Sequence, residues 1–167
     1  MTIKRFFVLA LALVVPFLAE AQSIVDNPVA SSEAIVISGN ARFTVLTPEM
    51  IRIEYSENVR FEDRATFTVL NRKLEVPTFI KSEDDTFLYI ETSNLKLKYR
   101  KGTDPRTVPA SANNLKVEVN NHGVSSVWYP GKPDPQNLKG TCRTLDGLMG
   151  ESKRSEMENG LVSRSGW

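Results

Sequence analysis

The sequence is short of the residues that build disulfides and metal sites. Its 167 residues include a single cysteine, Cys142, and a single histidine, His122. One cysteine excludes an intrachain disulfide and a cysteine-based zinc cluster, and one histidine excludes a histidine-rich metal site. The single histidine is also the only residue that could act as the base of a Ser-His-Asp triad. We therefore expect neither a metal nor another cofactor.

An excess of charge of either sign is also missing. Lysine plus arginine total 21 and aspartate plus glutamate total 20, which gives a formal net charge of +1. Nucleic-acid binders and polybasic membrane-surface proteins need such an excess, so neither nucleic acid nor a membrane surface is an expected partner. The length is too short for a full (β/α)₈ barrel, which needs about 200–250 residues or more. The proportions of hydrophobic and charged residues, 41% and 25%, are those of an ordinary globular chain.

Long hydrophobic runs are absent except at the N-terminus. Lys4 and Arg5 precede an apolar run over residues 6–18, which is followed by an Ala-Glu-Ala exit at 19–21. A basic start, a short apolar core and small residues at the exit are typical of a secretory signal peptide. The run is shorter than the ~17–25 residues that span a bilayer. We expect cleavage after Ala21 and a periplasmic or secreted protein that has no membrane contact after cleavage.

A period of two between apolar and polar residues recurs from residue 33 onward. In residues 95–100, two leucines and a tyrosine alternate with three basic residues, so one face points to a core and the other to water. Strands are expected at 33–38, 42–47, 50–56, 66–69, 76–81, 86–93, 95–100 and 115–120. Glycine, proline, asparagine and aspartate between them suit tight antiparallel turns. The fold class predicted is all-β, an antiparallel β-sandwich.

The pattern changes towards the C-terminus. Residues 102–114 indicate a loop, and residues 130–150 contain prolines and glycines but no apolar run of strand length. We expect a signal peptide over 1–21, a β-sandwich over 22–129 and an irregular segment over 130–167. Lys96, Lys98 and Arg100 are expected to protect a sheet edge. Because the indole of Trp167 favours burial, we interpret the chain as part of a longer architecture.

Several short blocks resemble a known family. Residues 137–141 read NLKGT, residues 143–147 read RTLDG, and residues 159–167 read NGLVSRSGW after a charged spacer. This order resembles the N-terminal domain of glycoside hydrolase family 31, the α-glucosidase and α-xylosidase family. Its secreted bacterial members carry runs like NLGGT-x-RTLDG and then GLLSR-x-GW ahead of the catalytic barrel. Residues 47–55 also resemble the family's first sandwich strands, so the resemblance extends from about Asn27 to Trp167.

The resemblance implies a galactose-mutarotase-like sandwich in a retaining enzyme that hydrolyses terminal α-glycosidic bonds. In the family, both catalytic carboxylates are aspartates on a (β/α)₈ barrel that follows this region, so no catalytic residue is expected in this chain. Two partners are implied, namely an α-linked oligosaccharide and the barrel domain. The chain by itself is expected to be inactive. Lys139 departs from the family's usual glycine, and it accepts strain if the glycine provides backbone freedom there.

Four residues are candidates for positions next to the sugar. Arg143 and Asp146 lie in a glycine-bounded loop, where they either approach the sugar pocket or act structurally, Asp146 as a turn cap or as the partner of Arg143. Trp128 and Trp167 have faces that suit the apolar C–H side of a pyranose, although such residues also pack in cores and between domains. The acidic residues 83–85 are expected in a solvated turn.

Two other functions stay open at this point. The first is a stand-alone carbohydrate-binding module, because sandwiches of this type bind sugars. The second is an interaction or folding scaffold without a ligand site, which would expose a large apolar patch. The sequence does not indicate which sugar or linkage is involved.

Overall fold

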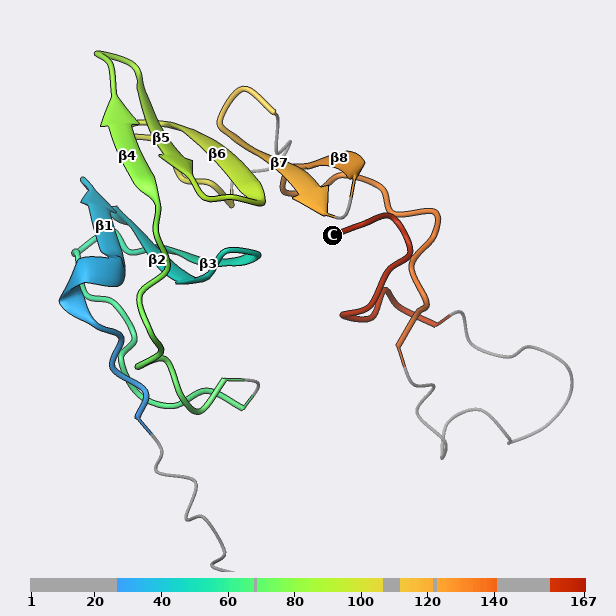
Figure 1. Cartoon of the computed structure of the whole chain (residues 1–167), viewed down its shortest axis with the longest axis horizontal. Helices are drawn as coiled ribbons and strands as arrows, with labels where there is room; N and C mark the ends of the chain where they lie inside the picture. Colours follow the sequence, from blue (N-terminus) through green and yellow to red (C-terminus); the bar gives the residue numbers. More distant parts are fainter. Residues whose placement is uncertain (1–26, 68, 107–111, 122, 141–156) are drawn as a thin grey trace, which may run out of the picture.

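The computed structural model describes residues 27–67, 69–106, 112–121, 123–140 and 157–167 (Figure 1). The predicted signal peptide over 1–21 and its cleavage site after Ala21 lie outside the described residues, as do His122 and Cys142. In the part of the chain that is described, no helix is both long and apolar enough to cross a membrane.

Two antiparallel sheets form the described part of the protein. The first sheet has the order β1-β2-β3 and the second the order β4-β5-β6-β7-β8, so each strand pairs with its neighbour in sequence. The strands are β1 (Ile35–Ser38), β2 (Ala41–Thr47), β3 (Met50–Tyr55), β4 (Ile80–Glu83), β5 (Phe87–Glu91), β6 (Leu95–Arg100), β7 (Leu115–Asn121) and β8 (Val124–Trp128). A 3₁₀ turn, η1 (Ser32–Ala34), precedes them. The predicted all-β, antiparallel sandwich is confirmed.

The core lies between the inner faces of the two sheets. Phe43 of β2 and Tyr99 of β6 are fully buried, and their ring centroids are 5.0 Å apart across the sandwich. The alternation read from the sequence decides which side chains point inward, because successive side chains of a strand face opposite ways. The buried hydrophobic cluster consists of Val36, Ala41, Phe43, Val45, Leu88, Ile90, Leu95, Leu97, Tyr99, Leu115 and Val117.

Three strand predictions need correction, and one strand was not predicted. The strand expected over 33–38 begins at Ile35, because residues 32–34 form the 3₁₀ turn η1. The strand expected over 66–69 is not found in its described residues, because the backbone groups of Thr66 and Val69 pair with each other and not with a neighbouring strand. The strand expected over 76–81 begins later, at Ile80, and runs to Glu83. Strand β8 was not predicted, because its Val-Ser-Ser-Val-Trp sequence lacks clear alternation, and pairing with β7 is what makes it a strand.

The expected role of the basic residues in β6 is also wrong. Strand β6 pairs with β5 on one side and β7 on the other, so it is a central strand and not an edge. Lys96 and Arg100 are nevertheless exposed, because they alternate with the buried Leu95, Leu97 and Tyr99 and so face the solvent side of the sheet. The edges of this sheet are β4 and β8.

Candidate functional site: a groove beside strand β3

A groove follows the free side of strand β3. The sheet of three strands packs on a sheet of five, which leaves part of the larger sheet's inner face without a strand opposite it. Two cavities of about 640 Å³ and about 410 Å³ lie there, and Ile53 of β3 and Trp128 of β8 line both of them. We call the two cavities together the β3 groove. Each volume lies within the range of about 300–1,000 Å³ that small-molecule pockets occupy.

Aromatic side chains line both parts of the groove. Tyr55 and Phe61 join Trp128 in the larger cavity, and Trp167 joins it in the smaller one. The ammonium group of Lys132 lies 4.2 Å from the ring centroid of Trp167, which is a favourable cation–π geometry. Trp167 is the last residue of the sequence, and Figure 1 shows the C-terminus beside β7 and β8. The two tryptophans singled out in the sequence are thus brought to one cavity, and both are half-buried.

Two glutamates of the larger cavity are already neutralised by arginines. Glu54 accepts from Arg42 Nε at 2.7 Å, and its other oxygen lies 2.7 Å from Arg52 Nη2. Glu62 forms an ion pair with Arg64, and hydrogen bonds from the Arg64 side chain lower the pKa of Glu62 to about 2. Both carboxylates are therefore engaged by arginines of this chain.

Two arginines of the larger cavity differ in how they are paired. Arg106 forms an ion pair with Asp104 at 2.9 Å, and its guanidinium lies 5.3 Å from the ring centroid of Tyr55. The guanidinium of Arg60 has no hydrogen bond or ion pair with any described residue, although its backbone N–H donates to Ser56 Oγ at 3.0 Å. Among the charged residues that line the larger cavity, the one side chain without an ionic partner in the described residues is therefore the cation Arg60.

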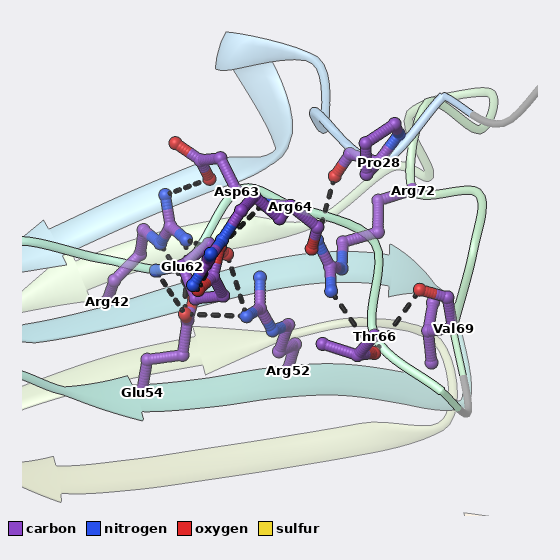
Figure 2. Close-up of polar contacts among 10 residues, drawn as sticks. All are labelled: Pro28, Arg42, Arg52, Glu54, Glu62, Asp63, Arg64, Thr66, Val69 and Arg72. Atoms are coloured by element: carbon purple, nitrogen blue, oxygen red, sulfur yellow. Dashed lines mark hydrogen bonds and ion pairs between the residues drawn. The ribbon is translucent and has the colours of Figure 1, made fainter.

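An arginine cluster, in which Arg42 and Arg72 are buried, lies on the outer side of the three-stranded sheet (Figure 2). We give this name to Arg42, Arg52, Glu54, Glu62, Asp63, Arg64 and Arg72. Arg42 is 5% exposed and donates to Glu54, to Asp63 Oδ1 at 2.7 Å and to the Glu62 carbonyl. Burial lowers the pKa of Arg42, but the hydrogen bonds to Glu54 and Asp63 outweigh it and raise the pKa overall. The cluster holds segment 56–64 on the sheet.

Arg72 anchors the neighbouring loop by a different means. It is 2% exposed, and its Nη1 donates to the carbonyl oxygens of Pro28 and Arg64, both at 3.0 Å. Its Nη2 donates to Thr66 Oγ1, as Figure 2 shows, while its Nε has no partner among the described residues. The side chain thus joins three segments through neutral oxygens.

The segments that follow β8 form a second hydrogen-bonded unit. Asp134 Oδ1 accepts from the hydroxyls of Ser163 and Ser165 at 2.8 and 2.6 Å. The Asn137 side chain accepts from the Gly160 N–H and donates to the Gly160 carbonyl. We call these five residues and the two segments they join, 133–140 and 157–165, the C-terminal clamp. The hydrogen bonds to Asp134, from Ser165 above all, lower its pKa.

The remaining candidates have structural positions or cannot be placed. Arg143 and Asp146 lie outside the described residues. Asp84 accepts from the backbone N–H groups of Thr86 and Phe87, both at 2.7 Å, and therefore caps the turn between β4 and β5. Of the residues 83–85 expected in a turn, Glu83 instead ends strand β4. Across the described ranges, no group of three or more histidine, cysteine, aspartate or glutamate side chains is arranged to hold a metal ion.

The sequence interpretation missed four residues of the larger cavity, namely Tyr55, Arg60, Phe61 and Arg106. Tyr55 was recognisable only as a core-facing strand residue. The other three lie in irregular segments, where periodicity gives no direction for a side chain.

Comparison with models of known protein families found no match. A search of curated proteins likewise found no match.

Proposed function

We propose that this chain is the N-terminal β-sandwich of an exported retaining α-glycoside hydrolase of family 31 type. In this proposal the enzyme hydrolyses terminal α-glycosidic bonds, and the catalytic aspartates belong to a (β/α)₈ barrel on which the sandwich packs. The chain supplies one wall of the sugar pocket and is inactive alone. The backbone at Lys139 is the observation that carries the proposal.

Lys139 adopts a backbone conformation that suits glycine. Its φ is 67°, in the left-handed region, where a side chain costs roughly 1–2 kcal/mol. The resembling family usually has glycine at this position. A backbone that favours glycine where this sequence replaces the motif's glycine by lysine supports the view that the local fold of the motif is kept.

The two described motif blocks also lie together in space. Leu138 donates its N–H to the Val162 carbonyl at 2.9 Å, and Gly140 donates to the Glu158 carbonyl at 2.8 Å. Asn137 and Ser163 form an isolated antiparallel bridge. Blocks that are about twenty residues apart in sequence therefore act as one unit, which supports treating them as a single linked motif.

The test is to read the gene beyond the Trp167 codon in the native host and to assay the chain by itself. We expect an in-frame continuation into alternating strand and helix patterns that carry two aspartates at strand ends. We also expect the isolated chain to show no turnover of aryl α-glucoside or aryl α-xyloside above background. A native protein that stops at Trp167, or clear turnover by the isolated chain, would overturn the proposal.

The β3 groove favours a second candidate function, a carbohydrate-binding module. Trp128 lines both cavities, and an indole face suits the apolar side of a pyranose. Calorimetry with maltose, isomaltose and xylosyl oligosaccharides tests this. Saturable binding that is lost in Trp128→Ala supports a binding module, and heats equal to those of buffer in all three titrations would exclude it for these sugars.

A further inference from the structure

The larger cavity of the β3 groove combines an aromatic surface with one unpaired cation. Tyr55, Phe61 and Trp128 contribute rings from three different segments of the chain. Two of the four charged residues lining the cavity are glutamates whose carboxylates already pair with the arginine cluster, and Arg106 pairs with Asp104. Arg60 is the residue whose guanidinium has no such partner among the described residues.

The turn that carries Arg60 is strained and built by specific side chains. Val59 has φ 58°, which is unfavourable for a β-branched residue and costs roughly 1–3 kcal/mol. The Ser56 hydroxyl donates to Asn58 Oδ1 at 2.8 Å, and both oxygens accept from the Arg60 N–H. The next residue, Phe61, is held under the guanidinium of Arg42 at 4.8 Å. The strained residue Val59 therefore lies directly before Arg60 and Phe61, which both line the cavity.

We propose that this cavity binds a sugar unit that carries a carboxylate, a uronic acid. The C–H face of the sugar lies on Trp128, and its carboxylate accepts a bidentate hydrogen bond from Arg60, next to Arg106. Charge complementarity decides between this ligand and a neutral sugar. An unpaired guanidinium gains most from a carboxylate, and the carboxylates that could repel the ligand are already paired. The inference goes beyond the proposed function, which concerns the hydrolysis of neutral α-glycosides.

The test compares two ligands that share the same sugar chain and differ at their carboxyl groups, which are charged in one and neutral methyl esters in the other. The full chain is titrated by calorimetry with α-1,4-linked trigalacturonate and with the methyl ester of the same trisaccharide. We expect the acid to bind at least about tenfold more tightly than the ester, because a charge-assisted hydrogen bond is lost on esterification. Hexaglutamate serves as a third probe, which presents carboxylates without a sugar ring.

Arg60→Gln is the deciding variant, because the side chain is exposed and its loss leaves the core intact. We expect it to bind the acid and the ester equally. Arg100→Gln is the matched control, since Arg100 is an exposed arginine on the outer face of the other sheet, and this variant is expected to retain the preference.

Three outcomes would overturn the inference. Equal affinity for acid and ester in the unaltered protein rejects the carboxylate and leaves a neutral sugar site. Hexaglutamate binding as tightly as trigalacturonate rejects the sugar ring. An acid preference that survives Arg60→Gln places the ligand elsewhere. None of these outcomes bears on the glycosidase proposal, which the gene sequence and the turnover assay decide separately.

Discussion

The arginine cluster and the C-terminal clamp perform the same task with opposite chemistry. Each fixes irregular chain by side-chain hydrogen bonds, but the cluster is centred on the nearly buried ion pair of Arg42 and Glu54, whereas the clamp uses one carboxylate and neutral partners near the surface. The Arg42 and Glu54 side chains are 6% and 14% exposed. In the clamp, Leu161 and Val162 are 90% and 61% exposed.

The comparison teaches where the chain is intolerant of change. A buried charge that loses its partner stays uncompensated, because water cannot reach it, so the nearly buried Arg42 and Glu54 depend strongly on each other. A group near the surface that loses a partner is rehydrated. We therefore expect changes in the cluster to affect the whole fold and changes in the clamp to stay local.

Arg42→Ala should have the largest effect. It removes the donors that bind Glu54 and Asp63, so that the nearly buried Glu54 keeps only Arg52 as an ionic partner, and removing one member of a buried ion pair costs up to about 3–5 kcal/mol. Chemical denaturation followed by circular dichroism measures the loss. The control is Lys98→Ala on the solvent face of β6, where we expect less than about 1 kcal/mol. Equal losses in the two variants would contradict the distinction between buried and exposed charge.

Gly160→Ala should open the clamp without unfolding the sandwich. A Cβ at this position would lie 2.4 Å from the Lys139 carbonyl oxygen, so the two segments must separate, at a local cost of about 1–3 kcal/mol. Amide hydrogen exchange should show lost protection at Leu138 and Gly140 but not in β5 or β6. Gly140→Ala is the matched control, because its Cβ would meet its nearest neighbour at an ordinary 3.5 Å. Global unfolding of Gly160→Ala would show that the clamp supports the whole fold.

Lys139→Gly should stabilise the clamp slightly. Glycine removes the penalty of the left-handed backbone but loses more chain entropy on folding, which leaves a gain of about 0.5–1 kcal/mol. The gain should appear as increased exchange protection at Gly140, and Lys139→Ala should show none. Reduced protection in the glycine variant would mean that the Lys139 Nζ hydrogen bond to Asn159 outweighs the strain.

Acid should weaken the clamp, with the smallest effect of the four. Hydrogen bonds from Ser165 foremost hold the pKa of Asp134 below its ordinary value of 3.8. The carboxylate therefore stabilises the clamp above that pH, and the stabilisation is lost as the pH falls through the lowered pKa. The amide resonances of Ser163 and Ser165 should shift together in an NMR titration from pH 6 to pH 2. Asp134→Asn should abolish the shared transition, and its persistence there would assign the titration to another group.

Prediction from sequence succeeded where one rule governs a segment. Strands β2, β3, β6 and β7 were predicted within about one residue of their ends, because alternation fixes both the strand and its inward face. It failed for β8, whose two serines hide the alternation, and for residues 66–69, which have strand-forming residue types but no partner. Of the candidate site, Trp128 and Trp167 were identified as aromatic candidates, but their meeting at one cavity was not.

The buried polar residues of β2 show why the rest was inaccessible. Arg42 and Thr44 alternate with core residues and so indicate a solvent face, yet both are buried, and Arg42 is held there by Glu62 and Asp63 of the segment that follows β3. No local pattern specifies where an irregular segment returns to the sheet. Its position depends on charge pairing between residues about ten to twenty apart.

The sequence by itself determined that this protein is made of antiparallel strands and which side chains of most strands point to the core, because side-chain direction in a strand has a period of two. Only the tertiary structure decided that β6 is central, that Arg42 is buried and that Arg60 faces an aromatic cavity. These features arise from pairing between strands and from the docking of irregular segments. Both are set by contacts between distant residues and leave no periodic trace in the chain.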